Sequence, residues 1–124
     1  MAVQRCIVAV NEARTSADIV IVSMHSGTEY VGVPNAKQVA FAHAMIDAGA
    51  DVVIGHHPHW VQTIEEYKGS PIFYSLGNFV FDQMWSQKTR EGMAILVNFD
   101  ARGVIDYKKQ QIVIEDYSQP TLVK

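Results

Sequence analysis

Two short runs of apolar, mostly β-branched residues lie on either side of a helical pattern, and this order restricts the fold more than any other feature. Residues 18–23 and 51–55 have the composition of strands that are buried on both faces. Residues 36–48 between them read as a helix that ends at Gly49 in the C′ position. Strand, helix and strand in this order predict a right-handed parallel βαβ unit. The carboxyl ends of both strands should therefore meet at one edge of a sheet.

The segments around this unit predict a helix before it and short strands after it. Apolar residues at helical spacing indicate an amphipathic helix over residues 2–13. The polar span 82–91 reads as a loop. We therefore expect an α/β fold in which the βαβ unit is followed by a mainly antiparallel β portion. Its strands are expected at residues 61–67, 72–75, 93–99 and 104–115, with turns at 68–71 and 100–103.

The composition indicates a globular chain of one domain or part of one. The length of 124 residues lies in the commonest size class for a domain. Hydrophobic residues make up 48% and charged residues 19%, which argues against disorder. We expect a single partial domain with a helix in residues 1–16, the βαβ unit in 17–60 and mainly β structure in 61–124.

Charge and cysteine content restrict the possible partners. A formal net charge of −3 without a cluster of Lys or Arg argues against a nucleic-acid partner. The single cysteine, Cys6, cannot form an intrachain disulfide, so the cysteine content does not distinguish an oxidising from a reducing compartment. No stretch of about 18 apolar residues is present, and the first 14 residues lack the order of a secretory signal. Membrane association is therefore expected only through a larger parent protein.

Three histidines are placed to converge at the predicted sheet edge. His57 and His59 follow the second strand, and Pro58 between them predicts an extended segment with both imidazoles on the same side. His25 ends the first strand. Neutral imidazole suits Zn, Fe, Mn, Ni or Cu, and a metal site with open positions polarises a phosphoryl or carbonyl oxygen and lowers the pKa of bound water toward ~7. The pattern indicates a metal-dependent hydrolase.

A structural role is the alternative for each histidine taken singly. A lone histidine at a strand end is more often hydrogen-bonded to neighbouring backbone than bound to a metal. The clustering of three favours the metal site. His56 should point to the opposite face from His57, and His43 reads as a residue on the flank of the helix.

Other polar residues near these histidines are candidates for binding metal or substrate. Glu29 and Asp82 could each bind a metal or a substrate amine, or be a solvated loop charge and a turn or cap residue. Tyr74, Ser75 and Asn78 surround a glycine-bearing turn that could line a pocket and offer donors to an anion. A structural corner between strands is the alternative for this second group.

Three motifs in order resemble the CapA family of poly-γ-glutamate capsule biosynthesis proteins. They are residues 24–30 (MHSGTEY), 55–59 (GHHPH) and 74–81 (YSLGNFVF). The resemblance covers about residues 17–99. CapA-like proteins are similar to calcineurin-type metallophosphoesterases, which implies a pair of sheets sandwiched between helices with a two-metal site at the strand ends. The resemblance thus implies that this chain forms part of such a sandwich.

The resemblance also implies roles for single residues. The family's isolated strand-end histidine and its later H-x-H motif match His25, His57 and His59 as metal ligands and catalytic residues. The ions would be divalent Mn, Fe or Zn, and the resemblance implies two of them in a full-length protein. Ser26 stands where the family usually has Trp, which predicts a different pocket lining. The family's early Asp-bearing strand, bridging carboxylate and Asn-His pair have no counterpart before residue 17, so we expect the C-terminal half of a CapA-like domain, inactive alone.

Three functional expectations follow. The first is metal-dependent hydrolysis or transfer by the full-length protein at a phosphate ester or amide, on a small molecule or a γ-glutamyl polymer, with Glu29, Tyr74, Ser75 and Asn78 contacting the substrate. The second is a module without chemistry that binds an anionic envelope polymer or holds a synthase partner. The third is self-association into a homo-oligomer, because an incomplete sheet leaves an open edge.

Overall fold

The computed structural model describes residues 2–124; Met1, which begins the expected N-terminal segment, lies outside them. The chain forms a mixed α/β fold with two sheets, in the orders β1-β2-β4-β3 and β5-β6-β7. The general α/β class is therefore confirmed. In chain order the elements are α1 (Ala2–Arg14), β1 (Ile21–His25), α2 (Ala36–Asp47), β2 (Val52–His56), β3 (Ile64–Tyr67), β4 (Ser70–Phe73), α3 (Gln87–Arg90), β5 (Glu91–Asp100), β6 (Gly103–Glu115) and β7 (Gln119–Leu122).

The predicted βαβ unit is present. β1 and β2 pair in parallel, and α2 lies between them in sequence. Asn35 begins α2 with a capping box, in which its side chain accepts from the backbone of Gln38 while the Gln38 side chain accepts from the backbone N–H of Asn35. Gly49 follows the helix at φ 114°, a conformation that favours glycine. The strand ends therefore meet at one edge, as predicted.

The strand after β3 differs from the expectation of a mainly antiparallel second half. β4 pairs in parallel with β2 and belongs to the first sheet. The turn at Lys68 and Gly69 reverses the chain after β3, so β4 runs antiparallel to β3 and alongside β2. Ile72 and Phe73 of β4 are fully buried. Burial of these two side chains favours the central position of β4.

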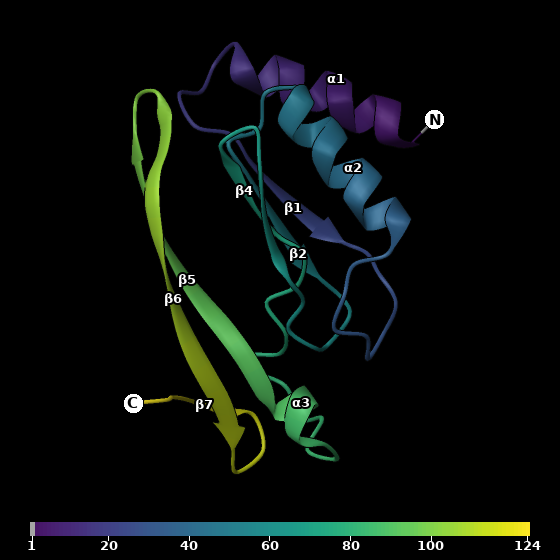
Figure 1. The fold of residues 1–124 in the computed structure, drawn as a ribbon, viewed down its shortest axis with the longest axis vertical. Helices are drawn as coiled ribbons and strands as arrows, with labels where there is room; N and C mark the ends of the chain where they lie inside the picture. The colour runs from purple at the N-terminus through teal and green to yellow at the C-terminus, as the bar shows by residue number, and fades with distance from the viewer. Residues whose placement is uncertain (1) are drawn as a thin grey trace.

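The first sheet lies between two helices and the second sheet. Figure 1 shows α1 and α2 on one side of β1, β2 and β4, and the long hairpin of β5 and β6 on the other side. Met45 of α2 packs in the main core with Val53 and Ile72. The Phe73 ring meets the Tyr107 ring of β6 edge-on, with centroids 5.0 Å apart. Both faces of the central strands are thus covered.

The first strand is exposed on one face, which corrects the prediction that it is buried on both. Ile21 is 50% exposed, whereas Met24 is buried against the core. β1 is the edge strand of the first sheet, and alternate residues point away from α1 and α2. The β-branched composition therefore predicted the strand but not its place in the sheet.

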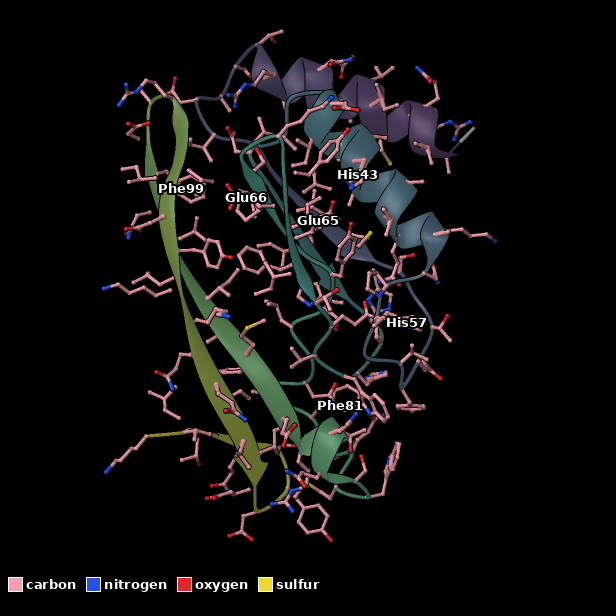
Figure 2. The ribbon with its side chains drawn as sticks, in the orientation of Figure 1. His43, His57, Glu65, Glu66, Phe81 and Phe99 are labelled. Carbon is pink, nitrogen blue, oxygen red and sulfur yellow. The ribbon has the colours of Figure 1, made fainter. Side chains whose placement is uncertain are left out.

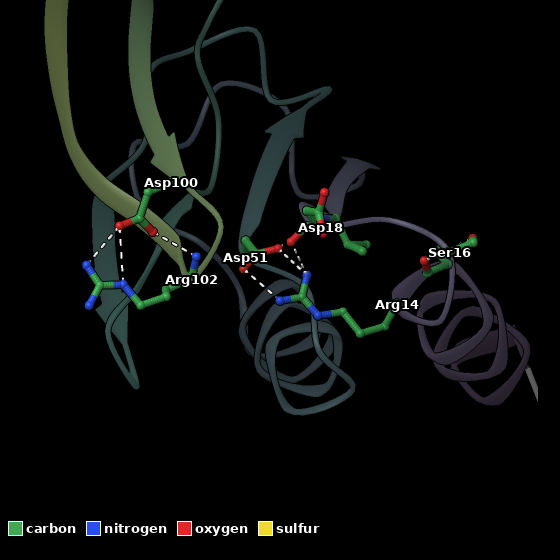
Figure 3. Close-up of polar contacts among 8 residues, drawn as sticks. Arg14, Ser16, Asp18, Asp51, Asp100 and Arg102 are labelled. Atoms are coloured by element: carbon green, nitrogen blue, oxygen red, sulfur yellow. Dashed lines mark hydrogen bonds and ion pairs between the residues drawn. The ribbon is translucent and has the colours of Figure 1, made fainter.

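An ion pair fixes α1 against the start of β2. Arg14 donates from Nη1 to Asp51 Oδ2 at 2.7 Å, and Asp51 also accepts from the backbone N–H of Val20 at 2.8 Å. Figure 3 shows these contacts beside the separate pair of Asp100 and Arg102 in the β5–β6 turn. Asp51 is 8% exposed, so its charge is satisfied by these partners rather than by water.

Backbone contacts join the two sheets near the carboxyl ends of β2 and β4. Gly77 forms an isolated antiparallel bridge with Gly92, and Met93 N donates to Leu76 O at 2.8 Å. A Cβ atom at Gly92 would lie 2.0 Å from the Asn78 carbonyl oxygen. The two backbones therefore approach so closely that no side chain fits at residue 92.

Two short elements were not predicted. α3 lies in the span expected to be a loop, and the Ser86 side chain caps it by accepting from Thr89 N. β7 adds a third strand to the second sheet beside β6. Across residues 2–124, none of the helices has the length and apolar character needed to cross a bilayer.

Candidate metal centre

Backbone hydrogen bonds hold the loop after β1 against the loop after β2. Ser26 N donates to His56 O at 3.1 Å, and Tyr30 N donates to Pro58 O at 2.8 Å. Between these two contacts, Gly27 has φ 133°, and a Cβ atom there would lie 2.8 Å from Pro58 Cγ. The two loops therefore lie close together along this stretch, which brings the first loop next to the histidines of the second.

Glu29, His57 and His59 form a cluster with the composition of a metal site. One potential ligand atom from each residue lies within 4.8 Å of the others. His59 Nε2 and Glu29 Oε1 are 3.8 Å apart, and the Glu29 side chain is 49% exposed. Two imidazoles and one carboxylate suit Zn, Fe or Mn and leave further coordination positions open. We call these three residues the metal-site cluster; Figure 2 labels His57 in the loops below the first sheet.

The backbone of the H-P-H segment differs from the extended form that its sequence predicts. His57 has φ 102° and His59 has φ 60°. Both values lie in the left-handed region, which is uncommon for residues other than glycine. The ring centroids are 6.1 Å apart. The extended prediction is wrong, yet the rings share one side because two turns, rather than a straight strand, bring them together.

His25 lies next to this cluster but outside it. It is exposed at the end of β1, and its ring centroid lies 4.9 Å from that of His57. In the register of the two strands it pairs with His56. Burial, and secondarily the charge of His25, lowers the pKa of His56. A ligand role for His25 stays a prediction.

Aromatic side chains surround the His59 ring. Tyr30 stacks on it with centroids 5.9 Å apart, and Phe81 lies at 5.0 Å. Trp85 meets the Tyr30 ring edge-on at 4.9 Å. Tyr30 and Phe81 belong to two of the family motifs, but sequence reasoning assigned neither of them, nor Trp85, to the site.

Of the three residues predicted around the glycine turn, Asn78 lies beside the metal-site cluster. Its Oδ1 is 2.9 Å from His59 Nδ1. Tyr74 is 1% exposed and donates its hydroxyl to Glu65 at 2.5 Å, and burial raises its pKa. Ser75 is equally buried and accepts from Gly77 N. Contact of these residues with a substrate stays a prediction.

A second histidine–carboxylate pair lies between α2 and β3. His43 Nε2 is 2.9 Å from Glu65 Oε1, and Figure 2 shows the two side chains close together. The His43 ring also stacks on Tyr67, with centroids 3.8 Å apart and planes 5° from parallel. The hydrogen bond from Tyr74, and then that from His43, lowers the pKa of Glu65. These contacts satisfy the pair within the fold.

The chain matches a known family over most of its length. Residues 1–83 match the family described as bacterial capsule synthesis protein PGA_cap. The chain belongs to this family. The match includes both loops of the metal-site cluster, as well as His25 and Asn78. The PGA_cap match therefore confirms the resemblance drawn from the three motifs.

Several curated proteins are similar to this PGA_cap chain. The PGA biosynthesis protein CapA of Bacillus subtilis is 45% identical over 93% of this chain, which covers 30% of that relative. The capsule biosynthesis protein CapA of Bacillus anthracis is 52% identical over 70% of this chain and 20% of its own length. A probable polyglutamine synthesis accessory protein of Mycobacterium tuberculosis is 49% identical over 52% of this chain, and the match covers 17% of that relative's length. The chain thus spans less than a third of each of these relatives.

Proposed function

We propose that this chain supplies metal ligands to a CapA-like protein of poly-γ-glutamate capsule biosynthesis, which acts as a metal-dependent, phosphoesterase-like hydrolase or transferase. The observation that carries the proposal is the convergence of Glu29, His57 and His59 at the carboxyl ends of parallel strands. Ligand sites assemble at this edge in α/β sheets. The printed names of the Bacillus relatives, which refer to PGA or capsule biosynthesis, support the biological process.

The three residues fit a divalent ion through their own chemistry. His57 and His59 offer imidazole nitrogens, and Glu29 offers a carboxylate oxygen with its side chain half exposed. A divalent ion bound there would polarise a phosphoryl or carbonyl oxygen of the substrate and lower the pKa of water. Tyr30 and Phe81 shield the His59 ring from water on its faces. The left-handed backbone of both histidines favours a functional role, because such conformations gather at sites rather than in ordinary loops.

The same proposal includes the type of sandwich, the extent of the domain and a role for His25. We propose that the two sheets form part of a metallophosphoesterase-like sandwich and that residues 1–124 are one partial domain of it. His25, adjacent to His57, would contribute to a second ion together with residues of the longer protein. Catalysis would then require those residues.

A binding module without chemistry is the second candidate. Phe79, Val80 and Trp85 are 54%, 64% and 61% exposed, and Trp85 meets the Tyr30 ring that stacks on His59. Lys88 lies 4.4 Å from the Trp60 ring centroid and supplies a cation in the same region. Such a surface could hold a polymer with carboxylates through Lys88 and its apolar rings.

Calorimetric titration of the 124-residue chain with Mn²⁺ and with Zn²⁺ tests the metal site. We expect about one ion per chain, and no specific binding in the double variant His57→Ala, His59→Ala. The matched control is His43→Ala, which removes a histidine of the satisfied pair and should leave the affinity unchanged. Specific binding that survives in the double variant would refute the assignment of these ligands.

Assays of the longer protein separate the two candidate functions. Turnover of a phosphodiester or γ-glutamyl substrate that needs added divalent metal and is lost in His57→Ala supports the enzyme. Saturable binding of poly-γ-glutamate that is unaffected by a chelator, without metal-dependent turnover, supports the module.

A further inference from the structure

The Asn78 side chain is held in one orientation by contacts on its amide nitrogen. Asn78 is 6% exposed, and its Nδ2 donates to Thr89 O at 2.9 Å and to Gln83 Oε1 at 3.2 Å. The Thr89 carbonyl can only accept a hydrogen bond. If the amide were rotated by half a turn, two acceptor oxygens would face one another in a buried site. The Nδ2 end therefore faces Thr89, and the Oδ1 end faces His59.

The partners of Asn78 are themselves fixed. Thr89 is fully buried, and its hydroxyl donates to Gln83 O at 2.8 Å. The Gln83 side chain donates from Nε2 to the Tyr30 hydroxyl at 3.2 Å, which leaves its Oε1 to accept from Asn78. Tyr30 in turn stacks on the His59 ring. A closed set of contacts thus orients both the amide and the ring that it meets.

The distances around His59 decide which ring nitrogen carries the proton in the neutral form. Asn78 Oδ1, an acceptor, lies 2.9 Å from Nδ1, so Nδ1 must donate. Glu29 Oε1 lies 3.8 Å from Nε2, which is too long for a hydrogen bond. If the proton were on Nε2, the lone pair of Nδ1 would face a lone pair of Asn78 Oδ1. The Nε2–H group would also gain no hydrogen bond to Glu29. The neutral ring therefore carries its proton on Nδ1.

We propose that Asn78 is a positioning residue that holds His59 as the Nδ1–H tautomer and directs the Nε2 lone pair toward Glu29 and His57. The proposal rests on the proposed metal-binding function and gives Asn78 a role through His59 rather than through the substrate. A hydrogen bond to the second nitrogen of a ligating histidine fixes its tautomer and orientation, and loss of such a bond typically lowers metal affinity about 10–100-fold.

The tautomer can be read directly from the metal-free chain. Long-range ¹H–¹⁵N correlation spectra of histidine-labelled protein above pH 8 distinguish a protonated Nδ1 from a protonated Nε2. We expect the Nδ1–H pattern for His59 in the wild type. We expect Asn78→Leu to lose that pattern. Ser86→Ala, which removes the cap of α3 in the same region without touching His59, should keep it.

Calorimetry with Zn²⁺ completes the test. Asn78→Leu should bind Zn²⁺ about 10–100-fold more weakly than the wild type, and the control Ser86→Ala should remain within a few-fold of it. An Nε2–H pattern in the wild type would overturn the inference whether or not metal binds. An Nδ1–H pattern without Zn²⁺ binding in the wild type would refute the proposed function and leave the tautomer assignment standing. Equal weakening by Ser86→Ala and Asn78→Leu would show a structural role only.

Discussion

The two histidine–carboxylate pairs in this chain have the same chemistry and different geometry. His43 and Glu65 are 2.9 Å apart and hydrogen-bonded, and Glu65 also accepts from Tyr74. His59 and Glu29 are 3.8 Å apart, and the hydrogen-bonding partner of His59 is Asn78 instead. The first pair satisfies its lone pairs internally. The second pair leaves a nitrogen and a carboxylate facing one another across a gap, which is the arrangement that an ion needs.

The backbones that carry the two pairs also differ. His43 lies within the regular helix α2, and its ring stacks flat on Tyr67. His57 and His59 lie in a loop with positive φ values, held by contacts to a second loop. Regular structure and complete hydrogen bonding thus accompany the pair that stabilises the fold. Strained backbone and an open carboxylate accompany the pair that we propose to bind metal.

Removal of the open carboxylate should have the largest effect. Glu29→Gln keeps the size of the side chain but removes the charge, and we expect affinity for Mn²⁺ to fall by at least about 100-fold, because loss of a ligand should cost no less than loss of a ligand's hydrogen-bonded support. Calorimetry measures the change. Glu65→Gln is the matched control and should not alter affinity; an equal loss in both variants would remove the distinction between the pairs.

Removal of the stacked histidine should affect stability instead. His43→Ala deletes the contact with Tyr67 and the hydrogen bond to Glu65, and we expect the free energy of unfolding to fall by about 1–2 kcal/mol. Urea denaturation followed by circular dichroism measures it. The same substitution at His57 should change stability by less than about 0.5 kcal/mol. If His57→Ala proved more destabilising than His43→Ala, the assignment of a stabilising role to His43 rather than to His57 would be wrong.

The pH dependence of stability gives the smallest expected effect. Because its partners lower the pKa of Glu65 from an ordinary value of 4.5, this carboxylate stabilises the fold above that pH and loses its contribution as the pH falls through the folded pKa. Tyr74→Phe removes the main cause, so stability should fall less steeply below pH 4.5. Solvent screening at the partly exposed Glu65 keeps the change small.

Urea midpoints between pH 7 and pH 3 test this dependence. The wild type, Tyr74→Phe and Glu65→Gln should give successively shallower decreases on the acid side. An unchanged slope in Tyr74→Phe would mean that the hydroxyl does not support the charged form of Glu65.

The sequence predicted the parallel βαβ unit because both of its signals are local. Strand composition and the glycine that ends the helix, Gly49, need no information from distant residues. The edge position of β1 and the parallel pairing of β4 depend on which segments lie next to each other in the sheet, and a run of β-branched residues does not specify its neighbours. Local pattern thus predicted the elements better than their order.

The same distinction applies to the candidate site. His57 and His59 were predicted because two histidines separated by one residue at a strand end form a recognisable pattern. The contact of Glu29 with them depends on backbone hydrogen bonds between loops, and that of Asn78 depends on Thr89. Positive φ at His57 opposes the intrinsic preference of the residue, so no propensity could indicate it.

The close approach of Gly77 and Gly92 has a consequence for the order in which the site is completed during synthesis. His57 and His59 leave the ribosome well before Gly92, but the Asn78 amide is oriented by Thr89 and by the backbone pairing that Gly92 makes possible. A nascent chain that ends at residue 83, where the family match ends, already contains Glu29, His57 and His59. It still lacks the Thr89 carbonyl that orients the Asn78 amide, so the metal binding that we propose would reach its final geometry only after residue 89 has been added.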